Sequence, residues 1–138
     1  MNSTLNPYIN FKNNAREAMT FYQNVFGGEL SFKTFSDFQV PNMPADGVMH
    51  AQLNIDGKPF IMGSEANGDQ HNYAGMCLSL SGTNASDLRD QYTKLSDGGE
   101  ILQPLTKAQW GDEFGMFVDK FGITWMVNIG SMQMGQEQ

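Results

Sequence analysis

The sequence contains an internal repeat, and this repeat limits the folds open to the chain. A segment that starts with Asn-Ala at position 14 and reaches Gly-Gly-Glu at position 29 recurs between positions 84 and 100. The offset between the copies is 70 residues at their first match and 71 at their second. Repeat periods of about 20–50 residues indicate solenoids or propellers. Two copies at half the chain length instead indicate a duplicated αβ half-domain.

Each copy of the repeat predicts one helix. Apolar residues recur at helical spacing over 15–26, where Asn14 is a suitable N-cap and Glu17 stands at the capping-box position. In the second copy the apolar stripe runs over 85–95, after Asn84. A Gly-Gly pair follows each stripe, and glycine in the left-handed conformation is a common end of a helix.

The remaining segments have the composition of strands, so each half has the order β-α-β-β-β. The clearest are two hairpins, one closed by Asp56-Gly57 and one closed by a four-residue turn through Gly122. The strand segments with assigned bounds are 7–11, 30–38, 48–55 and 58–65 in the first half, and 76–80, 113–118 and 123–129 in the second. The strand after the second helix is expected from the repeat alone. We predict an α+β fold in a single domain over 1–138, with module one over 5–66, module two over 74–130 and a tail over 131–138.

Composition excludes several classes of protein. Of the 138 residues, 40% are hydrophobic and 17% charged, which is typical of a globular chain. The net charge of −7, with only eight Lys and Arg, argues against binding to nucleic acid or to an anionic membrane surface. No apolar run approaches the ~20 residues of a membrane span, and the N-terminal segment lacks the regions of a signal peptide. We therefore expect a cytoplasmic protein.

Hairpin register predicts the two faces of each sheet. With Ile55 opposite Lys58, the strands around Asp56-Gly57 place one apolar face under the helix and leave a mixed face on the other side. Such a mixture of aromatic, small and amide side chains suits a ligand-binding wall better than an open surface. The predicted ligand-binding residues on these mixed faces are Tyr8, Asn10, His50, Gln52, Ile61, Cys77, Ser79, Trp110, Phe117, Met126 and Asn128.

Three residues of the mixed faces are candidates for acid–base chemistry. Glu65 and Glu113, one from each half, can act as general bases if burial raises their pKa values. The alternative is that each is a carboxylate at the end of a strand, solvated or bound to a backbone N–H. His50 can carry a proton near neutral pH, or it can be a hydrogen-bonded structural histidine.

Aromatic and sulfur side chains are also ambiguous. Tyr8 can stack on a planar ligand, and Trp110 can either do the same or anchor a strand. Cys77, the only cysteine, excludes an intrachain disulfide, and with no basic neighbour in sequence it is expected to be an inert thiol rather than a nucleophile. The ten methionines either fill gaps in the core or make a ligand pocket adaptable.

Several motifs together resemble one family. They are the segments 6–11, 26–28 and 49–51, the pairs at 21–22, 110–111 and 114–115, and the Asp-Lys-Phe-Gly run at 119–122 followed by Trp125. In these motifs the chain resembles the PhnB-like branch of the vicinal oxygen chelate superfamily, which includes glyoxalases, bleomycin-resistance proteins and extradiol dioxygenases. The resemblance covers about 5–129. It implies two βαβββ modules whose curled mixed sheets surround a cavity, usually in a homodimer.

The same resemblance brings a methyltransferase label and a metal site, and the sequence supports neither. Related sequences are labelled 3-demethylubiquinone methyltransferase, yet a cofactor-binding glycine loop opens a helix, whereas both Gly-Gly pairs follow one. Metal-dependent relatives carry His or Glu at four inward positions, which fall here near Asn6, Ile61 (or Gly63), Gly75 and Met126. None of these is a strong ligand for a divalent metal, so we predict no metal and no cofactor.

Three functions follow from this interpretation. The first is a metal-free, homodimeric protein that binds a small organic molecule. The second is a lyase or isomerase of glyoxalase or dioxygenase type, which uses cavity carboxylates or a displaced metal site built from His50, Glu65, Glu113 and Cys77. The third is a resistance protein that sequesters a toxic compound. We prefer the first, because the ligand positions are empty and no nucleophile and base can be paired.

Overall fold

The computed structural model describes residues 3–66, 73 and 75–130, so the predicted tail over 131–138 lies outside the described residues. The chain divides into two compact units, Met1–Asn72 and Tyr73–Gln138, and each is described by itself. Both have the predicted order β-α-β-β-β. In the described part of the chain, no helix is long and apolar enough to cross a membrane.

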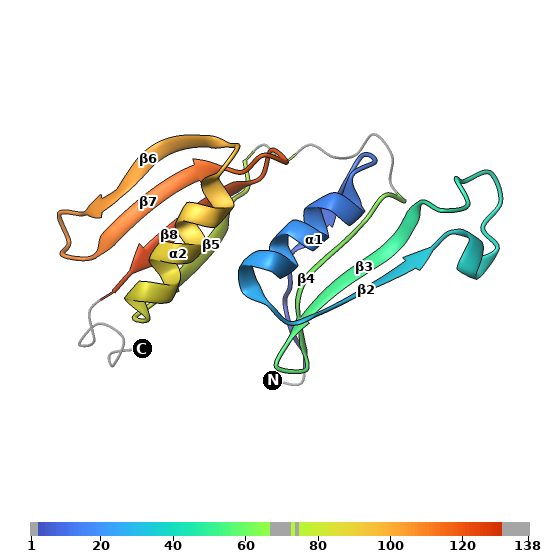
Figure 1. Cartoon of the computed structure of the whole chain (residues 1–138), viewed down its shortest axis with the longest axis horizontal. Coiled ribbons are helices and arrows are strands. Elements are labelled where there is room, and N and C mark those ends of the chain that lie inside the picture. Colours follow the sequence, from blue (N-terminus) through green and yellow to red (C-terminus); the bar gives the residue numbers. More distant parts are fainter. Residues whose placement is uncertain (1–2, 67–72, 74, 131–138) are drawn as a thin grey trace. The chain divides into compact units, whose positions relative to one another are not determined.

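Unit one is a four-stranded mixed sheet with one helix across it (Figure 1). Its elements are β1 Tyr8–Asn10, α1 Ala15–Phe26, β2 Glu29–Thr34, the short 3₁₀ helix η1 Ser36–Phe38, β3 Val48–Ile55 and β4 Lys58–Ser64. The strand order is β1-β4-β3-β2, with β1 parallel to β4 and the other pairs antiparallel. The sheet is open, and β1 and β2 form its edges.

Unit two repeats this plan (Figure 1). Its elements are β5 Leu78–Gly82, α2 Ala85–Ser96, β6 Glu100–Lys107, β7 Glu113–Val118 and β8 Thr124–Ile129. The order β5-β8-β7-β6 matches that of unit one strand for strand. The edge strand β5 is parallel to its neighbour β8, as β1 is to β4. The duplicated fold inferred from the repeat is confirmed, whereas a cavity shared by the modules stays a prediction.

The apolar stripe of each helix packs onto its own sheet. In unit one, Met19 and Tyr22 of α1 are fully buried together with Phe11 and Leu53. In unit two, Leu88 and Leu95 of α2 are buried over β5, β6 and β8. Burial of a large aliphatic or aromatic side chain contributes about 1.5–3 kcal/mol, so these stripes fix which face of each sheet the helix covers.

The Gly-Gly pairs let each helix turn directly into the next strand. Gly27 and Gly28 have φ values of 78° and 90°, which lie in the left-handed region that favours glycine. A Cβ atom on Gly28 would lie 2.2 Å from the carbonyl oxygen of Asn54, and one on Gly99 would lie 2.0 Å from that of Val118. Glycine is therefore required at Gly28 and Gly99, because the backbone there lies directly against the carbonyl groups of the neighbouring strand.

The predicted register of β4 is wrong beyond Pro59. A β-bulge between Leu53 and Asn54 pairs Asn54 with Pro59 but Leu53 with Ile61. The bulge adds one residue to β4, and a one-residue slip moves side chains to the opposite face of a sheet. Ile61 is consequently 2% exposed in the core rather than on the ligand-binding face, and Met62 takes its place there.

The predicted register of β7 is wrong for a related reason. The turn between β7 and β8 has five residues, because Val118 pairs with Thr124. The buried carboxylate of Asp119 stabilises this longer turn by accepting hydrogen bonds from the backbone N–H groups of Phe121 and Ile123, at 2.9 and 3.1 Å. Phe117 therefore lies in the core under α2 and is fully buried, whereas it was predicted to bind ligand.

Candidate functional site

A row of four polar side chains crosses the face of the first sheet that α1 leaves open. Tyr8 stands on β1, and His50, Gln52 and Asn54 alternate along β3. The Tyr8 hydroxyl lies 3.0 Å from His50 Nδ1, His50 Nε2 lies 3.0 Å from Gln52 Oε1, and Gln52 Nε2 lies 2.9 Å from Asn54 Oδ1. We call Tyr8, His50, Gln52 and Asn54 the polar row.

The hydrogen bonds of the polar row run in one direction. The amide oxygen of Gln52 can only accept, so His50 Nε2 carries the proton and donates it. In the neutral ring with its proton on Nε2, His50 Nδ1 is an acceptor, and the Tyr8 hydroxyl donates to it. At the other end, the Gln52 amide nitrogen donates to Asn54. The row thus presents phenol lone pairs at the Tyr8 end and amide N–H groups at the Asn54 end.

The neighbours of the polar row are partly apolar and partly charged. Met62 lies between Tyr8 and Gln52 in the sheet register and shares their face. On the edge strand β2, Lys33 pairs with His50 and Glu29 pairs with Asn54. Tyr8 is 46% exposed. This face can therefore hold polar groups at its two ends and an apolar body over Met62.

The open face of the second sheet has a different chemistry. Met126 on β8 lies beside Met116 on β7 and Ser79 on β5 in the register, so all three share one face. The thiol of Cys77, just before β5, donates to the sulfur of Met126 at 3.2 Å. Where unit one has amides and an imidazole, unit two has sulfur atoms.

An aromatic cluster continues this second face. Trp110 is 60% exposed, and its ring centre lies 5.7 Å from that of Phe114 in an edge-on arrangement. The indole N–H donates to the side-chain oxygen of Asn128 at 3.4 Å, and the Asn128 amide donates to the buried carboxylate of Asp112 at 3.0 Å. These two bonds hold Trp110 over the sheet in an exposed position.

Glu65 does not lie on the open face, so its predicted placement is wrong. Its two carboxylate oxygens accept hydrogen bonds, each 2.9 Å long, from the backbone N–H groups of Ala15 and Val48. Ala15 is the first residue of α1, so the carboxylate lies on the helix-covered side. It takes the place of the predicted capping box, since Asn14 makes no side-chain capping bond. The alternative of a carboxylate bound to a backbone N–H is confirmed.

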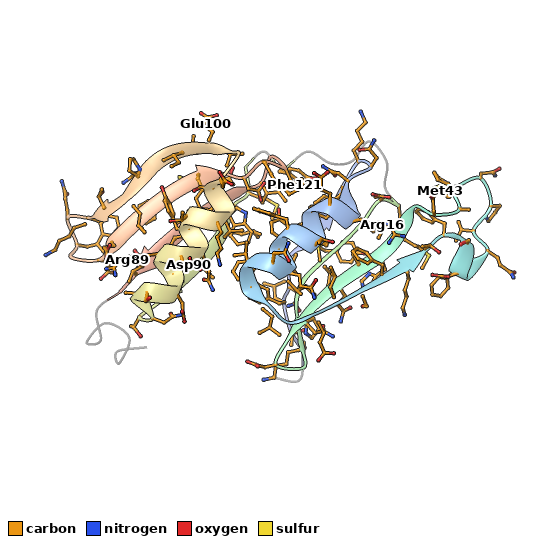
Figure 2. All side chains as sticks on the ribbon, in the orientation of Figure 1. Arg16, Met43, Arg89, Asp90, Glu100 and Phe121 are labelled. Atoms are coloured by element: carbon orange, nitrogen blue, oxygen red, sulfur yellow. The ribbon has the colours of Figure 1, made fainter. Side chains whose placement is uncertain are left out.

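Glu113 lies on the helix-covered side of the second sheet, and its predicted placement is also wrong. It pairs in register with the buried Ile129, and it forms an ion pair with Arg89, which projects from α2 (Figure 2). The hydrogen bonds from Arg89 hold the pKa of the Glu113 carboxyl below its usual range. A carboxylate with a lowered pKa and a fixed partner is a poor general base at neutral pH.

The structure does not bring together the residues of the displaced metal site. His50 bonds to Tyr8 and Gln52, whereas Glu65 bonds to backbone on the other side of the sheet. Across the described residues, no group of three or more His, Cys, Asp or Glu side chains is close enough to hold a metal ion. Asn6, one of the four expected ligand positions, donates its amide to the carbonyl of Pro59 at 2.8 Å.

A separate hollow of about 430 Å³ lies at the N-terminal end of α1. Charged residues of both signs line it, including Lys12, Arg16, Asp46 and Glu65. Arg16 is already engaged, because its guanidinium lies 5.1 Å from the ring centre of Phe32 and donates to the carbonyl of Asp46. This hollow is on the opposite side of the sheet from the polar row.

Of the predicted ligand-binding residues, the structure groups Tyr8, His50 and Gln52 on one face of unit one. It groups Cys77, Ser79, Trp110, Met126 and Asn128 on one face of unit two. Asn10 lies at the end of β1, opposite the buried Ser64. Asn54 and Met62 were missed: polar alternation at 50, 52 and 54 was a usable signal for Asn54, whereas Met62 could be placed only once the bulge was known.

Comparison with known proteins places the chain in a family. The family described as 3-demethylubiquinone-9 3-methyltransferase matches residues 3–128. Protein YjdN of Escherichia coli K12 is 27% identical over an alignment of 146 positions, gaps included. The alignment covers 96% of this chain and 99% of that protein.

Solved structures give the same result. Protein PA1353 from Pseudomonas aeruginosa is 30% identical with a TM-score of 0.77, covering 94% of this chain and 98% of that one. A putative 3-demethylubiquinone-9 3-methyltransferase, PhnB protein, from Bacillus cereus has the same fold, at 24% identity and a TM-score of 0.72 over 93% of this chain and 100% of that one. A member of the glyoxalase/bleomycin resistance protein/dioxygenase superfamily from Sphaerobacter thermophilus shares the fold at 18% identity, with a TM-score of 0.60 over 94% and 98% of the two chains. The chain belongs to the PhnB-like 3-demethylubiquinone-9 3-methyltransferase family and has the glyoxalase/bleomycin-resistance fold.

Proposed function

We propose that this protein binds a small organic molecule on the open face of its first sheet, without a divalent metal. The observation that carries the proposal is the polar row, in which three hydrogen bonds of 2.9–3.0 Å fix four side chains on the face of the sheet opposite α1. Polar side chains held in one orientation by each other are a typical means of orienting a ligand.

The direction of the polar row defines the chemistry of the ligand. The Tyr8 proton is used in the bond to His50, so a group that binds Tyr8 must donate a hydrogen bond to the phenol oxygen. At the other end, the Gln52 and Asn54 amides offer N–H groups to an acceptor such as a carbonyl. Met62 between the ends favours a flat apolar body. A ring compound with a hydroxyl at one end and a carbonyl at the other has this pattern.

The residues present do not fit the methyl donor that the family description implies. A donor bound through a glycine loop needs that loop to open a helix, whereas Gly28 and Gly99 follow helices and lie against the carbonyls of Asn54 and Val118. The first N–H of α1 is already occupied by the carboxylate of Glu65. We therefore derive no methyl-transfer step for this chain.

We further propose that the protein is a cytoplasmic homodimer, as the family resemblance implies. Large exposed apolar side chains support association with a second copy, namely Leu5, Met76, Ile101 and Leu102, which are 99, 75, 51 and 49% exposed. Light scattering at micromolar concentration should give twice the chain mass of 15.3 kDa. A mass near 15.3 kDa would contradict the dimer and leave the ligand proposal standing.

Thermal shift and calorimetry with a defined compound test the ligand proposal. The probe is 4-hydroxybenzamide, which carries the hydroxyl, the flat ring and the carbonyl, and benzamide is its control without the hydroxyl. We expect the hydroxylated compound to bind more tightly to the wild type, and Tyr8→Phe to remove that advantage. Ser79→Ala, on the open face of unit two, is the matched control variant. Equal affinity for both compounds, or the same preference in Tyr8→Phe, would contradict the assignment.

The same geometry favours a second candidate, an acid–base enzyme. A hydroxyl, an imidazole that accepts its proton, and a third group that orients the imidazole form the arrangement that activates hydroxyl groups in enzymes. Tyr8, His50 and Gln52 have these three roles. Exchange of a substrate C–H proton with solvent deuterium, lost in His50→Gln but retained in Glu65→Gln, would favour the enzyme over the binding protein.

A further inference from the structure

The open face of unit two gathers sulfur atoms from three neighbouring strands. Cys77 precedes β5, Met126 lies on β8 and Met116 lies on β7. The sheet register pairs Met116 directly with Met126, and directly paired residues of an antiparallel ladder have Cβ atoms about 4.5–5.5 Å apart. Cys77 is exposed, and its thiol donates to the Met126 sulfur.

We propose that Cys77, Met126 and Met116 form a binding site for a soft monovalent metal ion, Cu(I) or Ag(I). Thiolate and thioether sulfur are the ligands that select Cu(I) over hard or borderline ions. This site is independent of the polar row, because its residues belong to the other unit.

The spacing of the sulfur atoms fits one shared ion. Cys77 Sγ and Met126 Sδ are 3.2 Å apart. Metal–sulfur bonds are about 2.3 Å long in zinc thiolate sites, so three sulfur ligands around one ion stand roughly 4 Å apart. The two atoms must therefore separate by less than about 1 Å to share the ion. Methionine has three rotatable bonds, which allows Met116 to bring its sulfur to the same ion from the adjacent strand.

The chemistry of binding is an exchange of one proton for one ion. The Cys77 thiol loses its proton to solvent, the bond from S–H to the Met126 sulfur breaks, and thiolate–metal and thioether–metal bonds form. No oxidant or reductant takes part.

Competition with the coloured Cu(I) chelator bicinchoninate, without oxygen, tests the site on the full-length protein. We expect one Cu(I) per chain in the wild type and loss of tight binding in Cys77→Ser. Met126→Leu and Met116→Leu should each weaken binding by about tenfold or more, since changes outside the ligand shell already cost 10–100-fold in metal affinity. Leucine is close to methionine in volume and is expected to leave the fold intact.

The controls separate a built site from a reactive thiol. Met62→Leu, on the open face of unit one, should bind Cu(I) like the wild type. Ag(I) titration, which involves no change of oxidation state, should give the same order of affinities among the variants. X-ray absorption should show sulfur as the only first neighbour of copper. Wild-type affinity in both Met126→Leu and Met116→Leu would mean that the ion binds the thiol alone. Wild-type affinity in only one of them would remove that methionine from the site, and either result would overturn the proposal.

Discussion

The two units share their strand order but are held together by different carboxylates. In unit one, Glu65 connects the first turn of α1 to the start of β3 through two backbone N–H groups. In unit two, the N–H of Ala85, the first residue of α2, donates to the backbone carbonyl of Thr83. The buried carboxylate of Asp119 instead holds the turn between β7 and β8, and it accepts a hydrogen bond of 2.9 Å from the indole N–H of Trp125. The two units thus share the path of the backbone, but the carboxylates that stabilise it lie at different places in the fold.

The open faces differ in the same way. Unit one presents the polar row, and unit two presents Met116, Met126 and the exposed Trp110. Side chains that face a helix are constrained by packing, whereas side chains of the open faces are free to diverge. The two copies therefore differ in the chemistry of their open faces, one directional and polar, the other apolar and rich in sulfur.

The largest expected effect tests which residues of β7 are core. Phe117→Ala should lower the free energy of unfolding by about 3–5 kcal/mol, because the fully buried ring contacts Tyr92 and Trp125 under α2. Its neighbour Met116, on the open face, is the matched control, and Met116→Ala should cost much less. Urea denaturation measures both. A larger loss of unfolding free energy for Met116→Ala than for Phe117→Ala would contradict this register and support the one predicted from sequence.

Removal of the Asp119 carboxylate in unit two should cause the second-largest loss of stability. Asp119→Ala leaves the N–H groups of Phe121 and Ile123 and the indole N–H of Trp125 without their acceptor. Hydrogen bonds to a charged group contribute about 1.5–3 kcal/mol each but are not additive, so we expect a loss of about 3 kcal/mol. Trp125 fluorescence should also shift to longer wavelength as the indole becomes hydrated. Unchanged stability and emission would contradict the role of Asp119.

Removal of the Glu65 carboxylate in unit one should lower the free energy of unfolding by a somewhat smaller amount. Glu65→Ala removes the acceptor of two backbone N–H groups on a half-buried residue, and we expect a loss of about 2 kcal/mol. Glu65→Gln keeps one acceptor oxygen and should lose less. Hydrogen exchange should quicken at Ala15 and Val48 and stay unchanged in unit two. If hydrogen exchange quickens equally in both units, the Glu65 carboxylate does not stabilise unit one locally.

The smallest expected effect concerns the ion pair of unit two and its dependence on pH. Because Arg89 lowers the pKa of Glu113 in the folded protein, the pair stabilises the fold above the unfolded pKa of the carboxyl. This stability is lost as pH falls through the folded pKa. The difference in stability between the wild type and Glu113→Gln should therefore be small at neutral pH and vanish in acid. A difference that grows in acid would contradict the assigned pair.

The fold could be predicted from the sequence because its signals are local. The helix over 15–26 was placed to the residue, since its stripe, its N-cap position and its Gly-Gly end lie within a single stretch of chain. The hairpin strands were also placed closely, and β3 and β7 have the expected bounds of 48–55 and 113–118. Repetition of the same signals in both halves supplied the order of the elements, although no bounds were predicted for β6.

The candidate site could be predicted only in part, because a face depends on register. The face of β8 was right, and that of β3 was right from His50 onward, so His50, Gln52, Met126 and Asn128 were placed correctly. A bulge at the start of β3 puts Val48 in the core, whereas simple alternation places it on the same face as His50. The faces of β4 and β7 were wrong, because a bulge at one hairpin and a fifth turn residue at the other depend on pairing between strands. Neither leaves a signal in composition. Glu65 and Glu113 moved to the helix side for the same reason.

The nitrogen NMR spectrum of the His50 side chain tests the central claim most directly. If the polar row binds the ligand in the direction described, His50 should carry its proton on Nε2 and none on Nδ1 at pH 8. Addition of 4-hydroxybenzamide should then shift the His50 Nδ1 signal and the side-chain amide signals of Gln52 and Asn54, and Tyr8→Phe should abolish the shift at Nδ1. A proton on Nδ1 in the free protein, or no change at these three residues when the compound binds, would contradict the account.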